Sequence, residues 1–467
     1  MTYTNPSITT VIGSSAKGKT SRVIVPQILS AIEQDHSFVV CDPKNQILEY
    51  IGHKLSQKDY KVIILNLRDP EKSMSWNPLI PPYKIFINGN KQKAYSYLAD
   101  IAKNIYSSLG GNQKDFWDSS ACDFFVALVS SIFNKAREEQ INLKTILNMT
   151  VIGEERYATS NFLKAYFDLE DSNSYPFLTS HSVVNAPSDT KGGILSTFKN
   201  SLQRLTSNDK YESILCFNDF NLEDCIQKKV AIILNYEDEN PTNAEIITIF
   251  IDMLYKYLVD RRTKDKQLFT FSFFLDDFLS LPKLNSFDQM IMASGSRNIS
   301  LSIVINNKSL FEKYYGKESI NALLSNSNFI VYFKGNDIDT NDYIMKLCAQ
   351  KGFFWDETAL KFPLVISDTS VFSLSTPHAQ VNSFCTYSPI NKHANEKIEI
   401  FSIKEYVVKE KKRKMYENIG DINSDNKIEP EQAPGNPFFT SNEDISDLIA
   451  NIDERIQKLT AEENNPD

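Results

Sequence analysis

Short runs in which apolar residues fill consecutive positions recur along the chain, and each is followed by a turn or a helical pattern. Such runs, rich in Val, Ile and Phe, are typical of strands covered on both faces. The predicted strands are 7–13, 37–42, 61–67, 230–236, 271–277, 301–307 and 328–335. Apolar residues at helical spacing predict helices at about 20–34, 243–262, 286–296, 309–325 and 339–350. Strands that alternate with helices indicate an α/β fold with a mostly parallel sheet.

The pattern changes along the chain and predicts five segments. Residues 91–215 are helix-rich with no convincing strand, so we expect an all-helical insertion between two parts of the α/β domain, 1–90 and 216–405. Residues 406–440 join a charged run to a polar stretch with Pro and Gly, which predicts a linker. In 441–467 apolar residues recur at steps of three and four, which predicts an amphipathic helix and tail. That helix could dock a partner or the body of its own assembly.

Composition narrows the class of protein. With 467 residues, 42% of them hydrophobic, the chain can bury the cores of two or three structural units. The net charge of −9 argues against a protein that coats nucleic acid with its whole surface, but allows a local basic pore or loop. The six cysteines form no CxxC pair, and no apolar run reaches the ~18 residues of a membrane span. We therefore expect a soluble, cytoplasmic protein with reduced thiols and no structural metal.

The first predicted strand leads into GSSAKGKTS, residues 13–21, which matches the phosphate-binding loop pattern of Gly, four residues, Gly, Lys and Thr. A strand before such a loop and a helix after it direct backbone N–H groups toward an anion. Lys19 can then reach the β and γ phosphates, and the Thr20 hydroxyl can ligate Mg²⁺. The alternative is a Gly- and Ser-rich turn without a ligand. The predicted nucleotide-binding residues are Gly13, Ser14, Ser15, Ala16, Lys17, Gly18, Lys19, Thr20 and Ser21.

A pair of carboxylates follows the predicted strand at 271–277. Asp276 could hold Mg²⁺ through its water shell, and Asp277 could orient an attacking water. A strand that ends in acids is common, and on its own favours a structural role. Together with the phosphate loop, the pair predicts a site for ATP and Mg²⁺, with Thr20 and Asp276 as the metal-associated residues.

Several separated motifs carry a family resemblance. They are VVCDPKNQILEYIG (39–52), YKVIILNLRDPEKSMSWNPL (60–79), GNQKDFWDSSA (111–121), the acidic strand from 271, the Arg-bearing helix that follows it, and the Tyr-Gly phrase at Tyr315 and Gly316. In this order they resemble the TraG/TraD-type coupling proteins of type IV secretion systems, P-loop ATPases of conjugative DNA transfer. The resemblance covers most of residues 7–370.

The resemblance implies a RecA-like P-loop NTPase with an all-helical insertion, assembled as a homo-hexameric ring around a channel. It implies a place at the cytoplasmic face of the bacterial membrane, where such proteins hand single-stranded DNA with a bound relaxase to a secretion channel. Members of the family usually carry membrane-spanning helices ahead of the loop, whereas twelve residues precede Gly13 here. This chain is then a truncated form, a naturally anchor-less form, or one tethered by a separate membrane protein.

The family's site can be carried over residue by residue, with three departures. Asp277 stands where the family usually has Glu, and Asn306 where it has Gln, so each side chain is shorter by one methylene. Gly295 stands where the family often has an Arg proposed to reach a neighbouring subunit's phosphate, while Arg297 matches a second Arg. The residues that match are Gly13, Gly18, Lys19, Thr20, Asp276 and Arg297.

These observations lead to a hypothesis with alternatives. The chain is predicted to be a coupling protein, an ATP-binding ring motor whose catalytic residues are Lys19, Asp277, Arg297 and Asn306. Because three positions depart from the family, we expect tight ATP·Mg²⁺ binding but slow hydrolysis unless DNA or a partner completes the site. Alternatively Asp and Asn substitute adequately and Arg297 does the work of the absent arginine. A recruitment platform with weak or no hydrolysis, and a DNA translocase of the FtsK/HerA group, are the competing functions.

Overall fold

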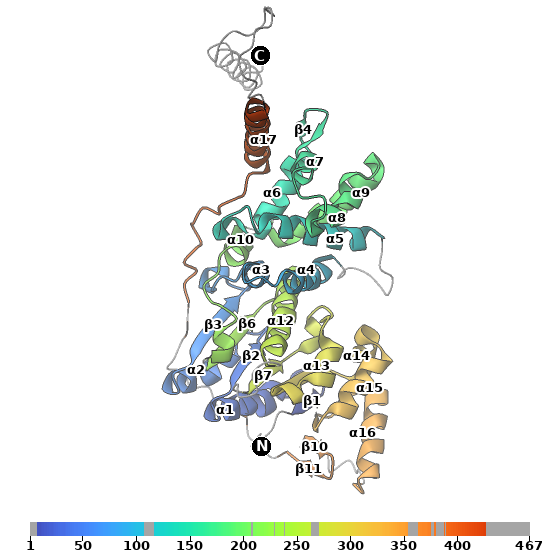
Figure 1. Ribbon diagram of the computed structural model, residues 1–467. Coiled ribbons are helices and arrows are strands. Elements are labelled where there is room, and N and C mark those ends of the chain that lie inside the picture. Colours follow the sequence, from blue (N-terminus) through green and yellow to red (C-terminus); the bar gives the residue numbers. More distant parts are fainter. Residues whose placement is uncertain are drawn as a thin grey trace, which may run out of the picture. The chain divides into compact units, whose positions relative to one another are not determined.

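The computed structural model describes residues 7–106, 116–206, 209–227, 229–237, 239–262, 270–353, 363–374, 378–379, 387 and 389–425 (Figure 1). The chain divides into two compact units, Met1–Lys409 and Glu410–Asp467. The first unit contains a nine-stranded sheet with helices on both of its faces.

All seven predicted strands are present in this sheet, which confirms the α/β fold. They are β1 (Ile8–Ile12), β2 (Ser37–Cys41), β3 (Lys61–Asn66), β6 (Val230–Asn235), β7 (Phe271–Leu275), β8 (Ile299–Ile305) and β9 (Phe329–Tyr332). The strand order is β11-β10-β9-β1-β8-β7-β2-β6-β3, and these seven pair in parallel throughout. Two strands that were not predicted, β10 (Leu364–Ser367) and β11 (Val371–Ser373), extend the β9 edge in antiparallel fashion.

The consecutive apolar residues of the strands are explained by an apolar layer on each face of the sheet. Successive side chains of a strand point to opposite faces. Val11 packs with the helices α1 (Val25–Glu33) and α2 (Ile47–Gln57), whereas Ile12 packs in the layer that includes α12 (Pro241–Arg262) (Figure 1).

The helices agree with the predicted ones in place but differ in two details. The helix expected at 20–34 begins with a π-helical turn, η1 (Thr20–Ile24), before α1. The helix expected at 309–325 is two helices, because Gly316 adopts φ 91°, a left-handed conformation that only glycine adopts readily. The remaining helices of this part are α11 (Asp224–Gln227), η4 (Phe278–Ser280), α13 (Phe287–Ala293), η5 (Gly295–Arg297), α14 (Lys308–Tyr315), α15 (Lys317–Asn326) and α16 (Ile338–Gln350).

The segment 91–215 is helical, as predicted, apart from a two-stranded hairpin of β4 (Arg156–Tyr157) and β5 (Ser160–Asn161). The expectation of no strand here is wrong, because strands of two residues leave no apolar pattern to find. That the segment forms a domain of its own stays a prediction. The helices of this segment, with the two that precede it in the chain, are η2 (Pro70–Lys72), α3 (Ile80–Ile87), α4 (Lys91–Tyr106), α5 (Phe116–Ile132), η3 (Glu138–Gln140), α6 (Leu143–Gly153), α7 (Phe162–Phe167), α8 (Tyr175–Val184), α9 (Ser188–Thr206) and α10 (Asp209–Cys216).

The Ser-x-x-Trp-Asn-Pro-Leu phrase is a structural junction. The Trp76 ring is buried and meets Phe250 of α12 edge-to-face, with ring centroids 4.9 Å apart. The Asn77 side chain is also buried, and its Nδ2 donates to the Ile141 carbonyl at 2.7 Å. The phrase therefore ties the chain after β3 to the sheet-covering helix α12 and to the helical segment.

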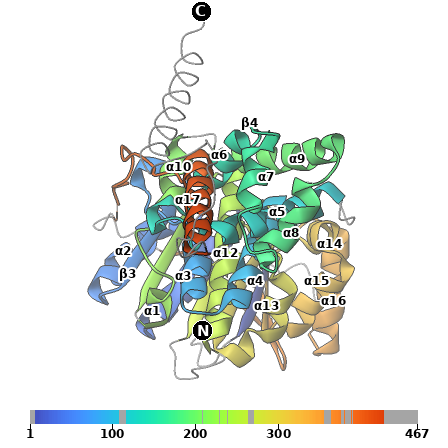
Figure 2. The same cartoon turned by 45° about the horizontal axis from the view of Figure 1, so that its top comes forward.

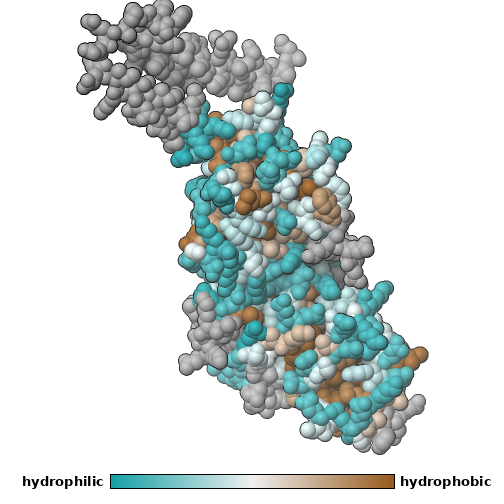
Figure 3. Space-filling model, turned by 45° about the vertical axis from the view of Figure 1, so that its right-hand side comes forward, coloured by the Kyte–Doolittle hydropathy of each residue, from teal (hydrophilic) through white to brown (hydrophobic). Residues whose placement is uncertain are grey.

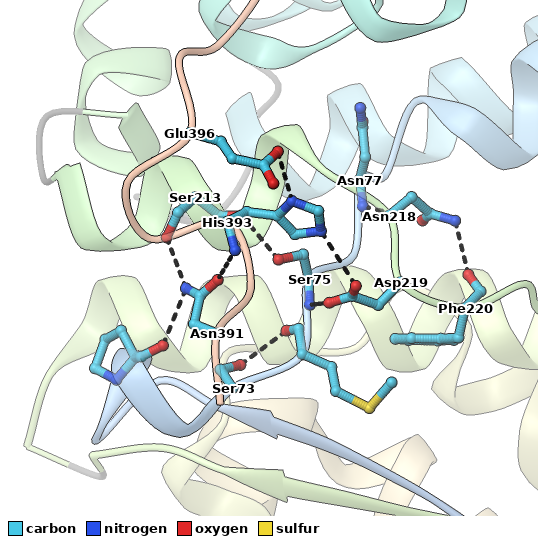
Figure 4. Close-up of polar contacts among 12 residues, drawn as sticks. Ser73, Ser75, Asn77, Ser213, Asn218, Asp219, Phe220, Asn391, His393 and Glu396 are labelled. Carbon is cyan, nitrogen blue, oxygen red and sulfur yellow. Dashed lines mark hydrogen bonds and ion pairs between the residues drawn. The ribbon is translucent and has the colours of Figure 1, made fainter. Parts of the chain in front are cut away.

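A later stretch of the chain closes over this junction (Figure 4). Ser75 N donates to Asp219 Oδ2 at 2.7 Å, and His393 Nε2 lies 3.1 Å from Asp219 Oδ1. The Asn391 side chain, which is buried, donates from Nδ2 to Ser213 Oγ at 2.9 Å. Residues around 391–393 are thus fastened to the junction by buried polar contacts.

The linker predicted at 406–440 is wrong in its first part, because a helix, α17 (Ile403–Asp425), occupies it. The start of α17 lies beside α6 and α7 (Figure 2), where Ile403 and Val407, four residues apart, are buried. Tyr406 packs on Tyr166 of α7, with ring centroids 5.5 Å apart. Its charged composition does not exclude a helix, because Glu, Lys and Arg are good helix formers. Residues 426–440 and the predicted terminal helix at 441–467 lie outside the described residues.

Candidate nucleotide-binding site

Three adjacent strands bring the predicted site residues together at one edge of the sheet. β8 pairs with β1 on one side and with β7 on the other, in parallel. Gly13 follows β1, Asp276 follows β7 and Asn306 follows β8. Because parallel strands end at the same edge, residues separated by up to 293 positions in the sequence meet there.

The backbone of the loop is shaped to present N–H groups. Ala16 and Gly18 adopt positive φ angles of 59° and 80°. Such conformations turn successive N–H groups toward one concave side, which suits an anion. Gly13 is required for a different reason, since a Cβ there would lie 2.5 Å from the Cβ of Phe333. That this loop is a phosphate cradle stays a prediction.

Lys19 is the buried cation of the site, with 7% of its surface exposed. Its Nζ donates to the carbonyl oxygens of Gly13 (2.5 Å) and Ser14 (3.1 Å) and to Asn306 Oδ1 (3.2 Å). Burial lowers the pKa of Lys19, and the nearby carboxylates of Asp277 and Asp276 oppose that shift. A phosphate would supply charge-assisted partners for an ammonium held in this way.

Thr20 and Asp276 are joined directly. Thr20 Oγ1 donates to Asp276 Oδ2 at 2.5 Å, and the backbone N of Asp277 donates to Asp276 Oδ1 at 3.1 Å. Burial raises the pKa of Asp276, while the bond from Thr20 opposes the shift. A hydroxyl and a carboxylate side by side supply the hard oxygen ligands that Mg²⁺ prefers, so these residues fit a Mg²⁺ held by Thr20 and, directly or through water, by Asp276.

Asp277 is directed at the same edge and has a cationic partner. Its backbone is left-handed (φ 48°, ψ 45°), a conformation in which Asp is found more often than most residues. Lys44 Nζ lies 3.4 Å from Asp277 Oδ2. The sequence named Asp277 as a site residue but missed Lys44, whose only signal was its place in the Asp-Pro-Lys phrase.

The Asp-Pro-Lys turn is held in place by its own first residue. The Asp42 carboxylate is buried and accepts hydrogen bonds from the backbone N of Gln46 (3.0 Å) and of Ile47 (2.7 Å) at the start of α2. Arg68 Nη2 donates to the Pro43 carbonyl at 2.8 Å. These bonds fix the turn that carries Lys44 to the site.

Burial raises the pKa of Asp42 to about 6, although the bonds from Gln46 and Ile47 oppose the shift. In the folded chain Asp42 therefore keeps its proton at a higher pH than in the unfolded chain. Its contribution to stability is present below pH 4 and is lost as pH rises through about 6. We expect the unfolding free energy of Asp42→Asn, relative to the unaltered chain, to rise by up to about 3 kcal/mol between pH 4 and 7. Denaturant titrations at both pH values check this; parallel pH profiles would contradict it.

Arg297 lies at the other edge of the sheet. It ends η5 just before β8 begins, whereas the loop and Asn306 lie where strands end. The seven residues of β8 separate the two edges by roughly 20 Å. Arg297 Nη1 donates to the Ala293 carbonyl at 3.1 Å, and Gly295 lies in the same short helix. The structure thus brings Lys19, Thr20, Asp276, Asp277 and Asn306 together, and not Arg297.

The loop, the acids and Lys44 enclose a pocket of about 180 Å³. Ser15, Ala16 and Lys17 are exposed at its rim. A larger pocket of about 400 Å³ lies between α4, α12 and α13, but its charged groups already have partners such as Lys256 with Asp100. Within the described part of the chain, no group of His, Cys, Asp and Glu could form a metal centre, and the described cysteines are unpaired thiols.

A parallel sheet with a phosphate loop after one strand and a carboxylate after a neighbouring strand defines a P-loop NTPase of the RecA type. Within that class the chain belongs to the family of type IV secretory system conjugative DNA transfer proteins, whose sequence profile matches residues 1–368.

Individual relatives agree with this assignment. The chain is 19% identical over 358 residues to the probable conjugal transfer protein TraG of Sinorhizobium fredii, an alignment that covers 75% of this chain and 54% of TraG. It therefore spans about half the length of that relative. The structure is similar to that of the bacterial conjugative coupling protein TrwB (TM-score 0.58, 14% identity, 82% of this chain and 87% of the other). It is also similar to VirB4 of Thermoanaerobacter pseudethanolicus (TM-score 0.50, 13% identity, 79% and 89%).

No helix formed by the described residues combines the length and the apolar character that crossing a bilayer requires.

Proposed function

We propose that this chain is an ATP-driven coupling protein of conjugative DNA transfer, which engages single-stranded DNA and passes it to a type IV secretion channel. The observation that carries the proposal is the convergence of Lys19, Thr20, Asp276 and Asn306 at the ends of three adjacent strands. Because the chain belongs to the conjugative DNA transfer family, the proposed process in which this site acts is the transfer of DNA.

ATP with Mg²⁺ is the proposed cofactor. Lys19 would hold the β and γ phosphates, and Thr20 with Asp276 would hold the metal, which stabilises the charge that develops during phosphoryl transfer. Asp277 would orient the attacking water, with Lys44 fixing its carboxylate, and Asn306 would contact the γ phosphate beside Lys19. The solved structures of TrwB include complexes with a non-hydrolysable ATP analogue and with ADP and Mg²⁺, which supports this assignment.

A ring of six copies is the proposed assembly. Arg297, which lies too far away to serve its own loop, would then be available to the site of a neighbouring copy. Exposed apolar side chains on α13, α14 and α16 support a face that is covered on assembly, and Figure 3 shows apolar residues gathered among hydrophilic ones in the lower part of the molecule. The exposed apolar side chains on these three helices are Met292, Tyr314, Ile338 and Met345.

The proposed partners are single-stranded DNA with its bound relaxase and the components of the secretion channel, at the cytoplasmic face of the membrane. The test is binding of a labelled single strand by fluorescence anisotropy, with a duplex of the same sequence as competitor and a non-hydrolysable ATP analogue present. We expect the single strand to bind more tightly, with an affinity that falls steeply with salt. Preference for the duplex would instead favour a translocase of the FtsK/HerA group.

A recruitment platform without strong hydrolysis is the second candidate, favoured by the short Asp277 side chain. The structure gives a physical reason for that residue, because its left-handed backbone suits Asp better than Glu.

We expect Asp277→Glu to raise DNA-stimulated ATP turnover several-fold, since the carboxylate moves closer to the water, at a cost of about 1 kcal/mol in unfolding free energy. Steady-state phosphate release measures the rate. Turnover that stays the same or falls would mean that the side-chain length at this position does not limit hydrolysis.

A further inference from the structure

A part of the chain beyond the family match contacts the phosphate loop. His378 Nδ1 lies 2.8 Å from Ser21 Oγ, and the backbone N of Ala379 donates to the Ser21 carbonyl at 3.1 Å. Arg22 Nη2 donates to the Leu374 carbonyl at 3.2 Å. Leu374, His378 and Ala379, which we call the covering residues, follow the end of the family match at residue 368.

The imidazole of His378 also lies against the loop backbone. A Cβ at Gly18 would stand 2.6 Å from its Cε1, so the ring occupies the space that a side chain there would need. The ring is exposed to solvent. With Nδ1 facing Ser21, Nε2 has no partner among the described residues and can donate or accept a hydrogen bond.

The position of the ring relative to the phosphates follows from its neighbours. Thr20 points to Asp276 at the metal end of the site, where the β and γ phosphates belong. Ser21, the next residue of the turn, points to a different side because successive side chains of a helical turn point in different directions. A nucleotide that runs from Lys19 past Gly18 would therefore bring its α-phosphate and ribose, and not its γ-phosphate, toward His378.

We propose that His378 is a nucleotide-binding residue, which contacts the α-phosphate or ribose of the nucleoside triphosphate through Nε2 while Ser21 fixes the ring through Nδ1. This inference rests on the proposed function, since it assumes that the loop binds a nucleotide. It assigns the nucleoside end of the site to one of the covering residues.

The test compares ATP with inorganic pyrophosphate, which can take the place of the β and γ phosphates but has neither an α-phosphate nor a nucleoside, both titrated with Mg²⁺ into the full chain by calorimetry. We expect His378→Ala to raise the Kd of ATP about tenfold, the effect of one hydrogen bond to a charged group, and to leave the Kd of pyrophosphate within about twofold. His378→Gln, whose amide reaches the position of Nε2, should bind ATP within about threefold of the unaltered chain. His378→Asn, whose amide reaches only the position of Nδ1, should behave like His378→Ala.

The matched control is His53→Ala, because His53 is also exposed and its ring is paired with Gln57 on α2.

Three outcomes would overturn the proposal: unchanged ATP affinity in His378→Ala, equal losses for ATP and pyrophosphate, or full ATP affinity in His378→Asn. Lys19→Ala separates this from failure of the proposed function. If Lys19→Ala still binds both ligands as the unaltered chain does, the loop is not the nucleotide site, whatever the His378 variants show.

Discussion

Replacing Lys19 with Ala is expected to weaken binding of ATP by about 100-fold, or about 2.7 kcal/mol, because the charge-assisted bonds to the phosphates are lost. Nζ is already directed into the site by Gly13 O, Ser14 O and Asn306 Oδ1. The ammonium therefore needs little rearrangement to meet a phosphate. Titration of the chain with a fluorescent ATP analogue gives the affinities.

The matched control for this variant is Lys54→Ala. Lys54 is a lysine of α2 whose Nζ pairs with Glu33 Oε1 at 2.5 Å. Its removal deletes the same charge from the chain but should leave nucleotide affinity within about twofold, because an exposed pair contributes little. Comparable losses in the two variants would mean that Lys19 acts only through net charge, and would remove the basis of the site.

Asp276→Asn is expected to reduce Mg²⁺-dependent ATP turnover about 1,000-fold, or about 4 kcal/mol, while nucleotide binding changes much less. Asn has the same shape: its Oδ1 can accept from the backbone N of Asp277 and its Nδ2 can donate to Thr20 Oγ1, but it has no negative charge for the metal. Burial raises the pKa of Asp276, so removing its charge should not destabilise the fold. Rates of phosphate release across a Mg²⁺ titration, with unfolding midpoints alongside, measure both effects.

The control for Asp276→Asn is Asp168→Asn, at the end of α7, where an exposed carboxylate pairs with Lys164. It should leave turnover unchanged. If Asp276→Asn keeps more than a tenth of the normal turnover at saturating Mg²⁺, Asp276 does not bind the metal. Replacing a metal-binding carboxylate with an amide should cost much more than tenfold in turnover.

Much of the fold could be predicted from the sequence because the strands are buried on both faces. Runs such as VAIIL, the first five residues of β6, carry no polar position, and helices between them force parallel pairing. The loop and Asp276 could be predicted because each follows a strand directly, so that the chain itself fixes their place. Lys19, Thr20 and Asp276 can therefore be predicted from the local sequence alone.

Other features depend on contacts that the sequence pattern does not record. Lys44 reaches Asp277 only because Asp42 fixes the turn before it. His378 meets Ser21 across 357 positions, with no motif around it. The first turns of α17 are ordered by the packing of Ile403, Tyr406 and Val407, in a sequence that otherwise resembles a linker. Each of these rests on packing between distant segments and not on local spacing.

The proposed function requires that this site hydrolyse ATP in response to DNA. The most direct measurement is steady-state ATP hydrolysis by the unaltered chain and by Lys19→Ala, each with and without single-stranded DNA. We predict slow turnover alone, stimulation by single-stranded DNA of about tenfold or more, and no stimulated turnover in Lys19→Ala. Turnover that is brisk without DNA, or that survives in Lys19→Ala, would contradict the account.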